Sequence, residues 1–245
     1  MKSEWFKDWF NTSEYLDVYR HRDEEDAENL IKLILKNVQV KPGAQVLDMA
    51  CGTGRHSIIL ARKNFNVTAF DLSENLLSIG KQSAESEKLS INFIHSDIRD
   101  FSSDIKFDLV VNLFTSFGYF ETDEENFSVF QKAYNFLDEG GFFVFDYFNS
   151  DFIKQNIVEN SREKIEGEEI IQQRTIENSR VNKKIVITKN GKISEYQESV
   201  KMYSKDELIL ELNKIGFDIY KTFGDFLGNK FDPLKSPRLI IICNK

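Results

Sequence analysis

A glycine turn after a short apolar stretch has the clearest chemical meaning in this 245-residue sequence. The run 46–54 reads Val-Leu-Asp-Met-Ala-Cys-Gly-Thr-Gly, and a helix-like stretch, 55–61, follows it. Glycine lets the backbone approach a bound ligand more closely than a Cβ would allow. A helix that begins just after the turn adds free N–H groups and the positive end of its dipole. The pattern predicts a buried strand, a tight turn and a pocket for a small molecule.

Three aspartates accompany the first three apolar stretches. Asp48 lies in the first stretch, Asp71 ends the stretch 67–70, and Asp97 follows the stretch 91–96. If these stretches are strands of a parallel sheet, all three acids lie at its carboxyl edge, where doubly wound folds bind ligands. Asp71 then stands where such folds place a ribose-binding acid.

The turn has a second interpretation as part of a dinucleotide-binding site, whose pattern is Gly-x-Gly-x-x-Gly or -Ala. Ser57 fills the third position here, so that pattern is incomplete. Ser57 and Asp97 together disfavour a nicotinamide-dependent dehydrogenase. Binding of NADH would favour this alternative again.

With this turn and the three spaced acids, the chain resembles the class I S-adenosylmethionine (SAM) dependent methyltransferases over roughly 23–149, and again from 204 onward. It looks most like small bacterial members that carry an inserted β meander and have no assigned substrate. His56 departs from the fuller Gly-x-Gly-x-Gly form of the turn. The resemblance implies SAM as cofactor and S-adenosylhomocysteine as product.

The resemblance also implies roles for individual residues. Asp48 holds the turn and the SAM ammonium, Asp71 takes both ribose hydroxyls, and Asp97 with the backbone at Ile98 contacts the adenine amino group. From its position alone, Arg22 is a hypothetical partner of the SAM carboxylate. The full set of candidate cofactor-binding residues is Arg22, Asp48, Ala50, Gly52, Gly54, Asp71, Leu72, Asp97, Ile98 and Asn112.

The three aspartates and His56 also have plainer interpretations. Asp71 begins a helix together with Ser73, because both residue types are good caps. Asp97 is a turn residue, Asp48 braces the loop, and His56 packs or faces solvent at the start of a helix.

Methyl transfer from a sulfonium is an in-line displacement with a neutral leaving group, so the protein supplies geometry, dehydration and, where needed, a base. Asp146 could orient or deprotonate an amine or hydroxyl, or it is a buried acid paired with Arg238 or a Lys. The aromatic rings of 114–120 could attract a sulfonium, by about 0.5–2 kcal/mol each. The alternative is that these rings pack against the N-terminal segment. Candidate catalytic residues are Asp146, Tyr119 and Tyr147, and candidate substrate contacts are Phe117, Tyr119, Tyr147, Tyr15 and Arg238.

The positions of the prolines argue against several classes of methyl acceptor. The three prolines, Pro42, Pro233 and Pro237, form neither the Pro-Pro-aromatic motif of enzymes that methylate adenine, cytosine N4 or glutamine, nor the Pro-Cys pair of cytosine C5 enzymes. An enzyme that methylates an N or O atom of a small molecule fits best. The alternatives are other SAM-using chemistry on the same fold, and a non-catalytic module that binds SAM, a protein or an RNA.

Strands that alternate with helices predict an α/β, doubly wound fold with a mostly parallel sheet. The resemblance implies that this sheet is Rossmann-like, with seven strands of which the final one is antiparallel. Asn190-Gly191 indicates a hairpin inside an inserted antiparallel meander. Four segments are expected: an aromatic N-terminal flap, 1–22; a SAM-binding core, 23–150; the meander on the substrate side, 151–203; and a last helix with two strands, 204–245.

Some element boundaries follow from single residues. Asp23 is expected to cap the first core helix. Capping boxes at Thr122 and Ser204 are expected to open two later helices. Gly140-Gly141 is expected to end the first of these, before a fifth strand at 142–145.

Composition excludes other classes. Forty acids against 32 bases give a formal charge of −8, which argues against a nonspecific grip on nucleic acid. Two cysteines form no disulfide framework, and three scattered histidines predict no metal site. We expect no signal peptide, because residues 1–6 have no apolar core, and no apolar run approaches the ~20 residues that span a membrane. We expect a cytoplasmic monomer or weak homodimer.

Overall fold

The computed structural model describes residues 4–20, 24–165 and 167–245. Its larger sheet has seven strands in the order β10-β11-β5-β4-β1-β2-β3. All neighbours from β5 to β3 pair in parallel, and β11 pairs antiparallel with both β5 and β10. The predicted doubly wound sheet with an antiparallel final strand is therefore confirmed. The strands are β1 (Gln45–Met49), β2 (Asn66–Asp71), β3 (Ile91–His95), β4 (Phe107–Asn112), β5 (Leu137–Phe148), β10 (Asp218–Phe223) and β11 (Arg238–Asn244).

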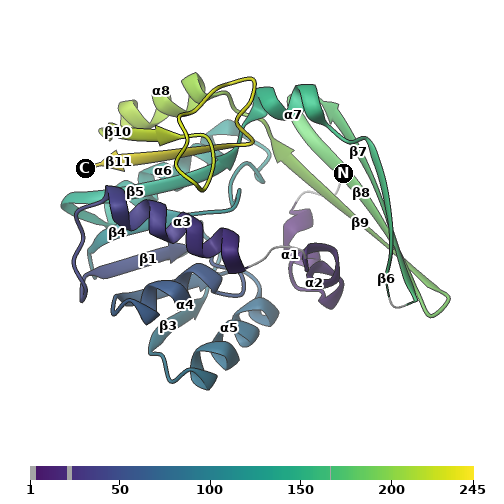
Figure 1. The fold of residues 1–245 in the computed structure, drawn as a ribbon, viewed down its shortest axis with the longest axis horizontal. Helices are drawn as coiled ribbons and strands as arrows, with labels where there is room; N and C mark the ends of the chain where they lie inside the picture. Colours follow the sequence, from purple (N-terminus) through teal and green to yellow (C-terminus); the bar gives the residue numbers. More distant parts are fainter. Residues whose placement is uncertain (1–3, 21–23, 166) are drawn as a thin grey trace.

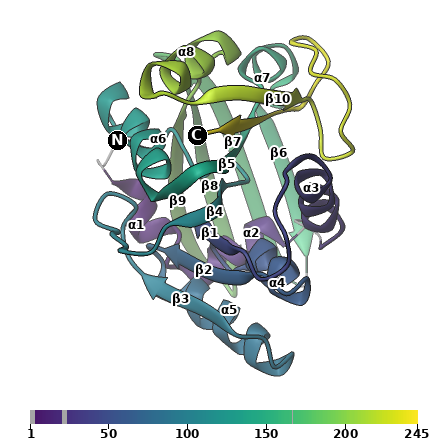
Figure 2. The ribbon, with the colours of Figure 1, turned by 90° about the vertical axis from the view of Figure 1, so that its left-hand side faces the viewer.

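Helices cover both faces of this sheet (Figure 2). Successive strand residues point to opposite faces, so Val46 packs in the same apolar cluster as Leu30 of α3, whereas Leu47 shares a cluster with Phe130 of α6. Helices α3 and α4 belong to the first cluster, and α6 and α8 to the second. The core helices are α3 (Glu24–Asn37), α4 (Arg55–Arg62), α5 (Glu74–Ser86), α6 (Asp123–Phe136), α7 (Ser150–Asn156) and α8 (Lys205–Ile215).

A second, four-stranded antiparallel sheet follows α7, as the predicted meander requires. Its hairpin between β8 and β9 turns at Asn190 and Gly191, whose φ angles are 51° and 76°. Asn178 and Ser179 make the same kind of two-residue turn between β7 and β8, with φ of 52° and 57°. Positive φ at both positions is the hairpin geometry that matches strand twist. The strands are β6 (Asn160–Ile165), β7 (Glu168–Glu177), β8 (Arg180–Lys189) and β9 (Lys192–Lys201).

Two short aromatic helices, α1 (Trp5–Trp9) and α2 (Ser13–Tyr19), lie between the core and the four-stranded sheet (Figure 1). Both tryptophans of the chain are in α1, where Trp5 is 8% and Trp9 1% exposed. Trp9 packs on Tyr196 of β9, with 4.4 Å between ring centroids. We call residues 4–20, which include α1 and α2, the roof.

One local expectation is wrong, and one helix has no counterpart in the expectations. Gly140 and Gly141 do not end a helix: α6 ends at Phe136, and both glycines lie inside β5. Both glycines stay in the sheet because they pair with Lys245. The N–H of Gly140 donates to the carbonyl of Lys245, and the N–H of Lys245 donates to the carbonyl of Gly141. Helix α7 was not expected, and it opens where the Asn149 side chain accepts from the N–H of Asp151.

Gly54 is required by packing as well as by its φ of 71°. A Cβ there would lie 2.8 Å from the ring of Phe93 on β3, whereas a Cβ at Gly43, with φ of 89°, would meet nothing within 4 Å. Both Gly→Ala changes incur the strain of a left-handed backbone. We expect Gly54→Ala to lower the free energy of unfolding in urea by about 1–3 kcal/mol more than Gly43→Ala does. Equal losses would show that the Phe93 ring moves aside.

Candidate functional site

A cavity of about 400 Å³ lies at the carboxyl ends of β1 to β4, beneath the roof. Its floor is the glycine turn, and one wall carries the ends of β2 and β3. Another wall is the loop after β4, 113–120. The roof contributes Phe6, Phe10, Tyr15, Leu16, Tyr19 and Arg20.

The carboxylate of Asp71 connects the end of β2 to the glycine turn. Its Oδ2 accepts from the N–H of Gly52 at 2.7 Å, and its Oδ1 accepts from that of Ser73 at 2.8 Å. Burial raises the pKa of Asp71, while these backbone donors oppose the shift. Ser73 caps α5 by accepting from the N–H of Leu76. The cap is therefore the serine, and the aspartate faces the cavity.

Asp48 lies on the floor of the cavity with 1% of its surface exposed. Ser57 Oγ donates to its Oδ2 at 2.6 Å. Burial first, and the nearby charge of Asp71 second, raise the pKa of Asp48 to about 7, against the hydrogen bond from Ser57. A positive group beside this carboxyl would stabilise its charged form.

Other predicted cofactor residues divide into two groups. Ala50, Gly52, Leu72, Asp97 and Ile98 line the cavity, but Gly54 and Asn112 do not. Asn112 is fully buried behind it, and its Nδ2 donates to the carbonyls of Met49 and Ser116. Asn112 thus holds β1 and the loop after β4 together. Arg22 and Asp23 lie outside the described residues.

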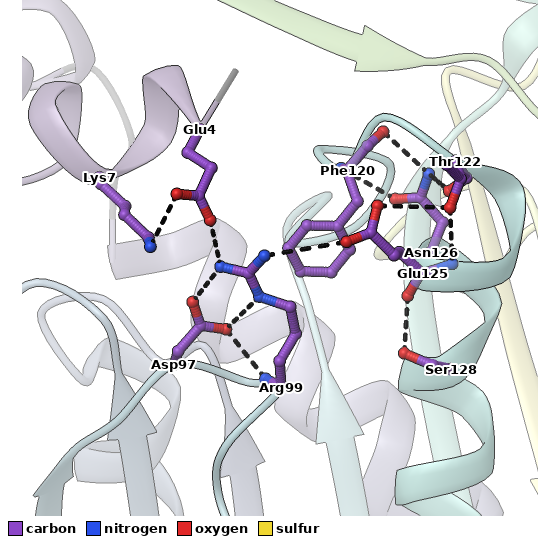
Figure 3. A network of polar contacts seen from close by, with 9 residues as sticks. All are labelled: Glu4, Lys7, Asp97, Arg99, Phe120, Thr122, Glu125, Asn126 and Ser128. Carbon is purple, nitrogen blue, oxygen red and sulfur yellow. Dashed lines mark hydrogen bonds and ion pairs between the residues drawn. The ribbon is translucent and has the colours of Figure 1, made fainter. Parts of the chain in front are cut away.

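Arg99 surrounds Asp97 with donors (Figure 3). Its backbone N–H and its Nε both donate to Asp97 Oδ1, at 2.9 and 3.0 Å, and its Nη2 lies 2.6 Å from Oδ2. Burial would raise the pKa of Asp97, but these contacts outweigh it and lower that pKa. Nη2 also lies 2.5 Å from Glu4 Oε1, and Nη1 lies 3.9 Å from Glu125. One guanidinium therefore connects the end of β3 to the roof and to α6.

The roof is also held from its other side, by the four-stranded sheet. Glu198 of β9 is 8% exposed and accepts from Trp9 Nε1 at 2.7 Å and from the Tyr19 hydroxyl at 2.6 Å. Lys183 of β8 lies 2.8 Å from its other oxygen and also donates to Tyr19. Burial would raise the pKa of Glu198, but Lys183 and the two hydrogen bonds lower it. We call Glu198, Lys183, Tyr19 and Trp9 the latch.

The substrate candidates are only partly brought together. Tyr15, Phe117 and Tyr119 line the cavity, whereas Tyr147 and Arg238 do not. Tyr147 is fully buried, and its hydroxyl donates to the Lys201 carbonyl. The Tyr119 hydroxyl donates to the Thr115 carbonyl at 2.7 Å.

Asp146 lies inside β5 and is fully buried beside Arg238, away from the cavity. Its oxygens accept from Arg238 Nε at 2.9 Å and Nη2 at 2.8 Å, and one also accepts from the N–H of Phe114. The structure thus shows the paired arrangement that the sequence left open. The pair supports an unusual loop, in which Phe114 and Thr115 have φ of 57° and 65°.

Sequence reasoning missed Arg99, Lys183 and Glu198. The two latch residues had a usable signal: the Asn190-Gly191 turn fixes the hairpin register, which places Lys183 directly opposite Glu198. No comparable signal pointed to Arg99, because its partners are contributed by three separate segments.

Comparison with known proteins agrees with this geometry. A family model described as a methyltransferase domain matches residues 46–141, which include the glycine turn, Asp71 and Asp97. The Bacillus subtilis (strain 168) protein named "Putative methyltransferase YqeM" is 38% identical over 107 residues, 43% of each protein. The chain spans about half the length of the curated relatives it matches.

Solved structures extend the likeness to nearly the whole fold. A SAM-dependent methyltransferase from Clostridium acetobutylicum ATCC 824 has a TM-score of 0.80 at 21% identity, covering 94% of this chain and 95% of that one. SAM-bound CalS10 from Micromonospora echinaspora, an amino pentose methyltransferase, has a TM-score of 0.66 at 18% identity, covering 95% and 97%. The predicted resemblance is confirmed, and the expectation of SAM as cofactor agrees with these matches. No helix among the described residues is long and apolar enough to span a membrane.

The latch can be tested through the two tryptophans, since both are in α1. Lys183→Met leaves the buried Glu198 without its cation, a change that typically costs about 3–5 kcal/mol. We expect the roof to loosen, with red-shifted tryptophan emission and stronger acrylamide quenching. Lys184→Met is the matched control, because Lys184 is exposed and pairs with Glu195. Identical emission from both variants would contradict the latch.

Proposed function

We propose that this chain, which carries a methyltransferase domain, transfers the methyl group of SAM to an N or O atom of a small molecule. The observation that carries the proposal is the set of residues on one cavity: the glycine turn, Asp71 at the end of β2, and Asp97 with Ile98 after β3. Their positions on one cavity support the parts of the cofactor that the resemblance assigns to them.

The residues present fit that cofactor. A Cβ on Gly52 would meet only Leu76, at 4.0 Å, so the glycine leaves the turn open toward the cavity. Asp71 is anchored by two backbone donors and still has acceptor capacity for hydroxyls, because a carboxylate offers about four lone-pair sites. Asp48 supplies a buried carboxyl near the turn for an ammonium group.

The chemistry that SAM supplies when bound is an electrophilic methyl group on a positively charged sulfur. The chain's own part is to bind, orient and exclude water. The roof and Phe114, Phe117 and Tyr119 provide apolar walls that do this. Asp146 is paired with Arg238 outside the cavity, so the proposal assigns it support of the loop after β4 rather than proton removal.

Several features support a small acceptor. The cavity lies under a roof that is held at both sides, by Arg99 and by the latch. The formal charge of −8 offers little attraction to a nucleic acid. CalS10, which shares the fold, acts on an amino pentose.

The first test is calorimetric binding of S-adenosylhomocysteine. We expect Asp71→Ala to weaken binding at least tenfold, about 1.4 kcal/mol, because the ribose hydroxyls lose their acceptor. Asp218→Ala is the control, because Asp218 is exposed at the start of the edge strand β10. Unchanged binding by Asp71→Ala would contradict the assigned role. Heat from NADH but none from S-adenosylhomocysteine would replace the proposal with a dehydrogenase.

Asp48 makes a proton-linked prediction. Its pKa of about 7 keeps most of the carboxyl protonated near pH 6.5, and the ammonium of bound S-adenosylhomocysteine favours the charged form. Binding of S-adenosylhomocysteine should therefore release a fraction of a proton from Asp48 near pH 6.5 and almost none near pH 8.5. Calorimetry in buffers of different ionisation enthalpy measures this release, and Asp48→Asn should abolish it. Heat that is independent of the buffer would contradict contact between Asp48 and the ammonium.

A further inference from the structure

His56 is the buried polar residue of the cavity that the proposed function leaves without a role. It lies in the first turn of α4, lines the cavity and is 5% exposed. Its Nε2 has no hydrogen-bond partner among the described residues. A buried polar atom without a partner typically costs about 1–3 kcal/mol, so a ligand that supplies the partner recovers that cost.

The state of the ring decides what it can bind. Burial first, and the charge of Arg55 second, lower the pKa of His56 to about 3, so the imidazole is neutral. A neutral imidazole has one N–H donor and one acceptor nitrogen. With the proton on Nδ1, the Nε2 atom is a hydrogen-bond acceptor inside an otherwise largely apolar wall.

The His56 ring follows the glycine turn in the sequence and packs against the loop after β4. Gly52, four residues earlier, belongs to the turn that would hold the methionyl part of the cofactor. On the other side, the His56 ring packs against Phe114, with 5.5 Å between centroids, and Phe114 belongs to the loop that walls the acceptor side. The transferred methyl group must lie between these two parts, because it joins the cofactor to the acceptor during transfer.

We propose, building on the proposed function, that Nε2 of His56 accepts a hydrogen bond from the N–H or O–H group of the methyl acceptor. The contact orients the acceptor's lone pair toward the methyl carbon. In the transfer, a bond forms from the acceptor atom to that carbon and the carbon–sulfur bond breaks. Its electron pair stays on sulfur, and the proton of the methylated acceptor leaves to solvent. The site thereby selects acceptors that carry a hydrogen-bond donor on the reacting atom.

Two cofactor analogues test this without knowledge of the acceptor. Sinefungin carries an amine in place of the methyl sulfonium, whereas S-adenosylhomocysteine has nothing at that position. Both are titrated by calorimetry into the wild type, His56→Phe and His56→Gln. We expect His56→Phe to weaken sinefungin about tenfold and S-adenosylhomocysteine less than twofold, because only the amine reaches Nε2. His56→Gln, which keeps an acceptor, should restore most of the sinefungin affinity.

A nuclear magnetic resonance measurement on the wild type avoids any folding defect of the variants. The chain has three histidines, so ring-nitrogen spectra are readily assigned. The His56 Nε2 resonance should shift with sinefungin and not with S-adenosylhomocysteine, so the complex with S-adenosylhomocysteine serves as the reference.

The outcomes separate this proposal from the proposed function. Equal losses of both analogues in His56→Phe, or an unmoved Nε2 resonance with sinefungin bound, would overturn the role of His56 and leave the cofactor assignment standing. Failure of both analogues to bind the wild type would overturn the two proposals together.

Discussion

A carboxylate buried away from water needs partners, and Glu198 obtains them from elements that are far apart in the sequence. Its donors come from α1, from the end of α2 and from β8. Loss of these donors would leave a charge in an apolar setting, so this contact stabilises the roof and the four-stranded sheet together. The cavity under the roof depends on this constraint. Arg99 applies a similar one from the core, by joining Glu4 to Asp97.

The parts of the site that could be predicted from sequence depend on local signals. Asp71 and Asp97 follow apolar stretches, and the carboxyl ends of parallel strands meet at one edge of the sheet. The turn at Asn190-Gly191 likewise encodes a hairpin in two residues. Such features need no knowledge of distant packing, and the sheet and the meander were therefore foreseen.

The remainder depends on which distant segments meet. By sequence, Asp146 has a suitable position for a base. In the structure it pairs with Arg238, because β11, which is 92 residues further along the chain at Arg238, lies next to β5. Gly140-Gly141 had the signature of a helix end, yet the C-terminal residue Lys245 holds it in the sheet. In both cases a tertiary contact overrides a local preference, and no pattern within a single segment contains that information.

The position of the four-stranded sheet in the chain has a consequence for divergence. The floor and the β2 and β3 walls of the cavity come from 46–98, whereas the roof and its supporting sheet come from 4–20 and 160–201. These segments share no strand, and the hydrogen bond that Gly52 of the glycine turn donates to Asp71 is made entirely within 46–98. Under the proposed function, substitutions in 4–20 and 160–201 can therefore change which acceptor is bound while the segment 46–98 stays constant.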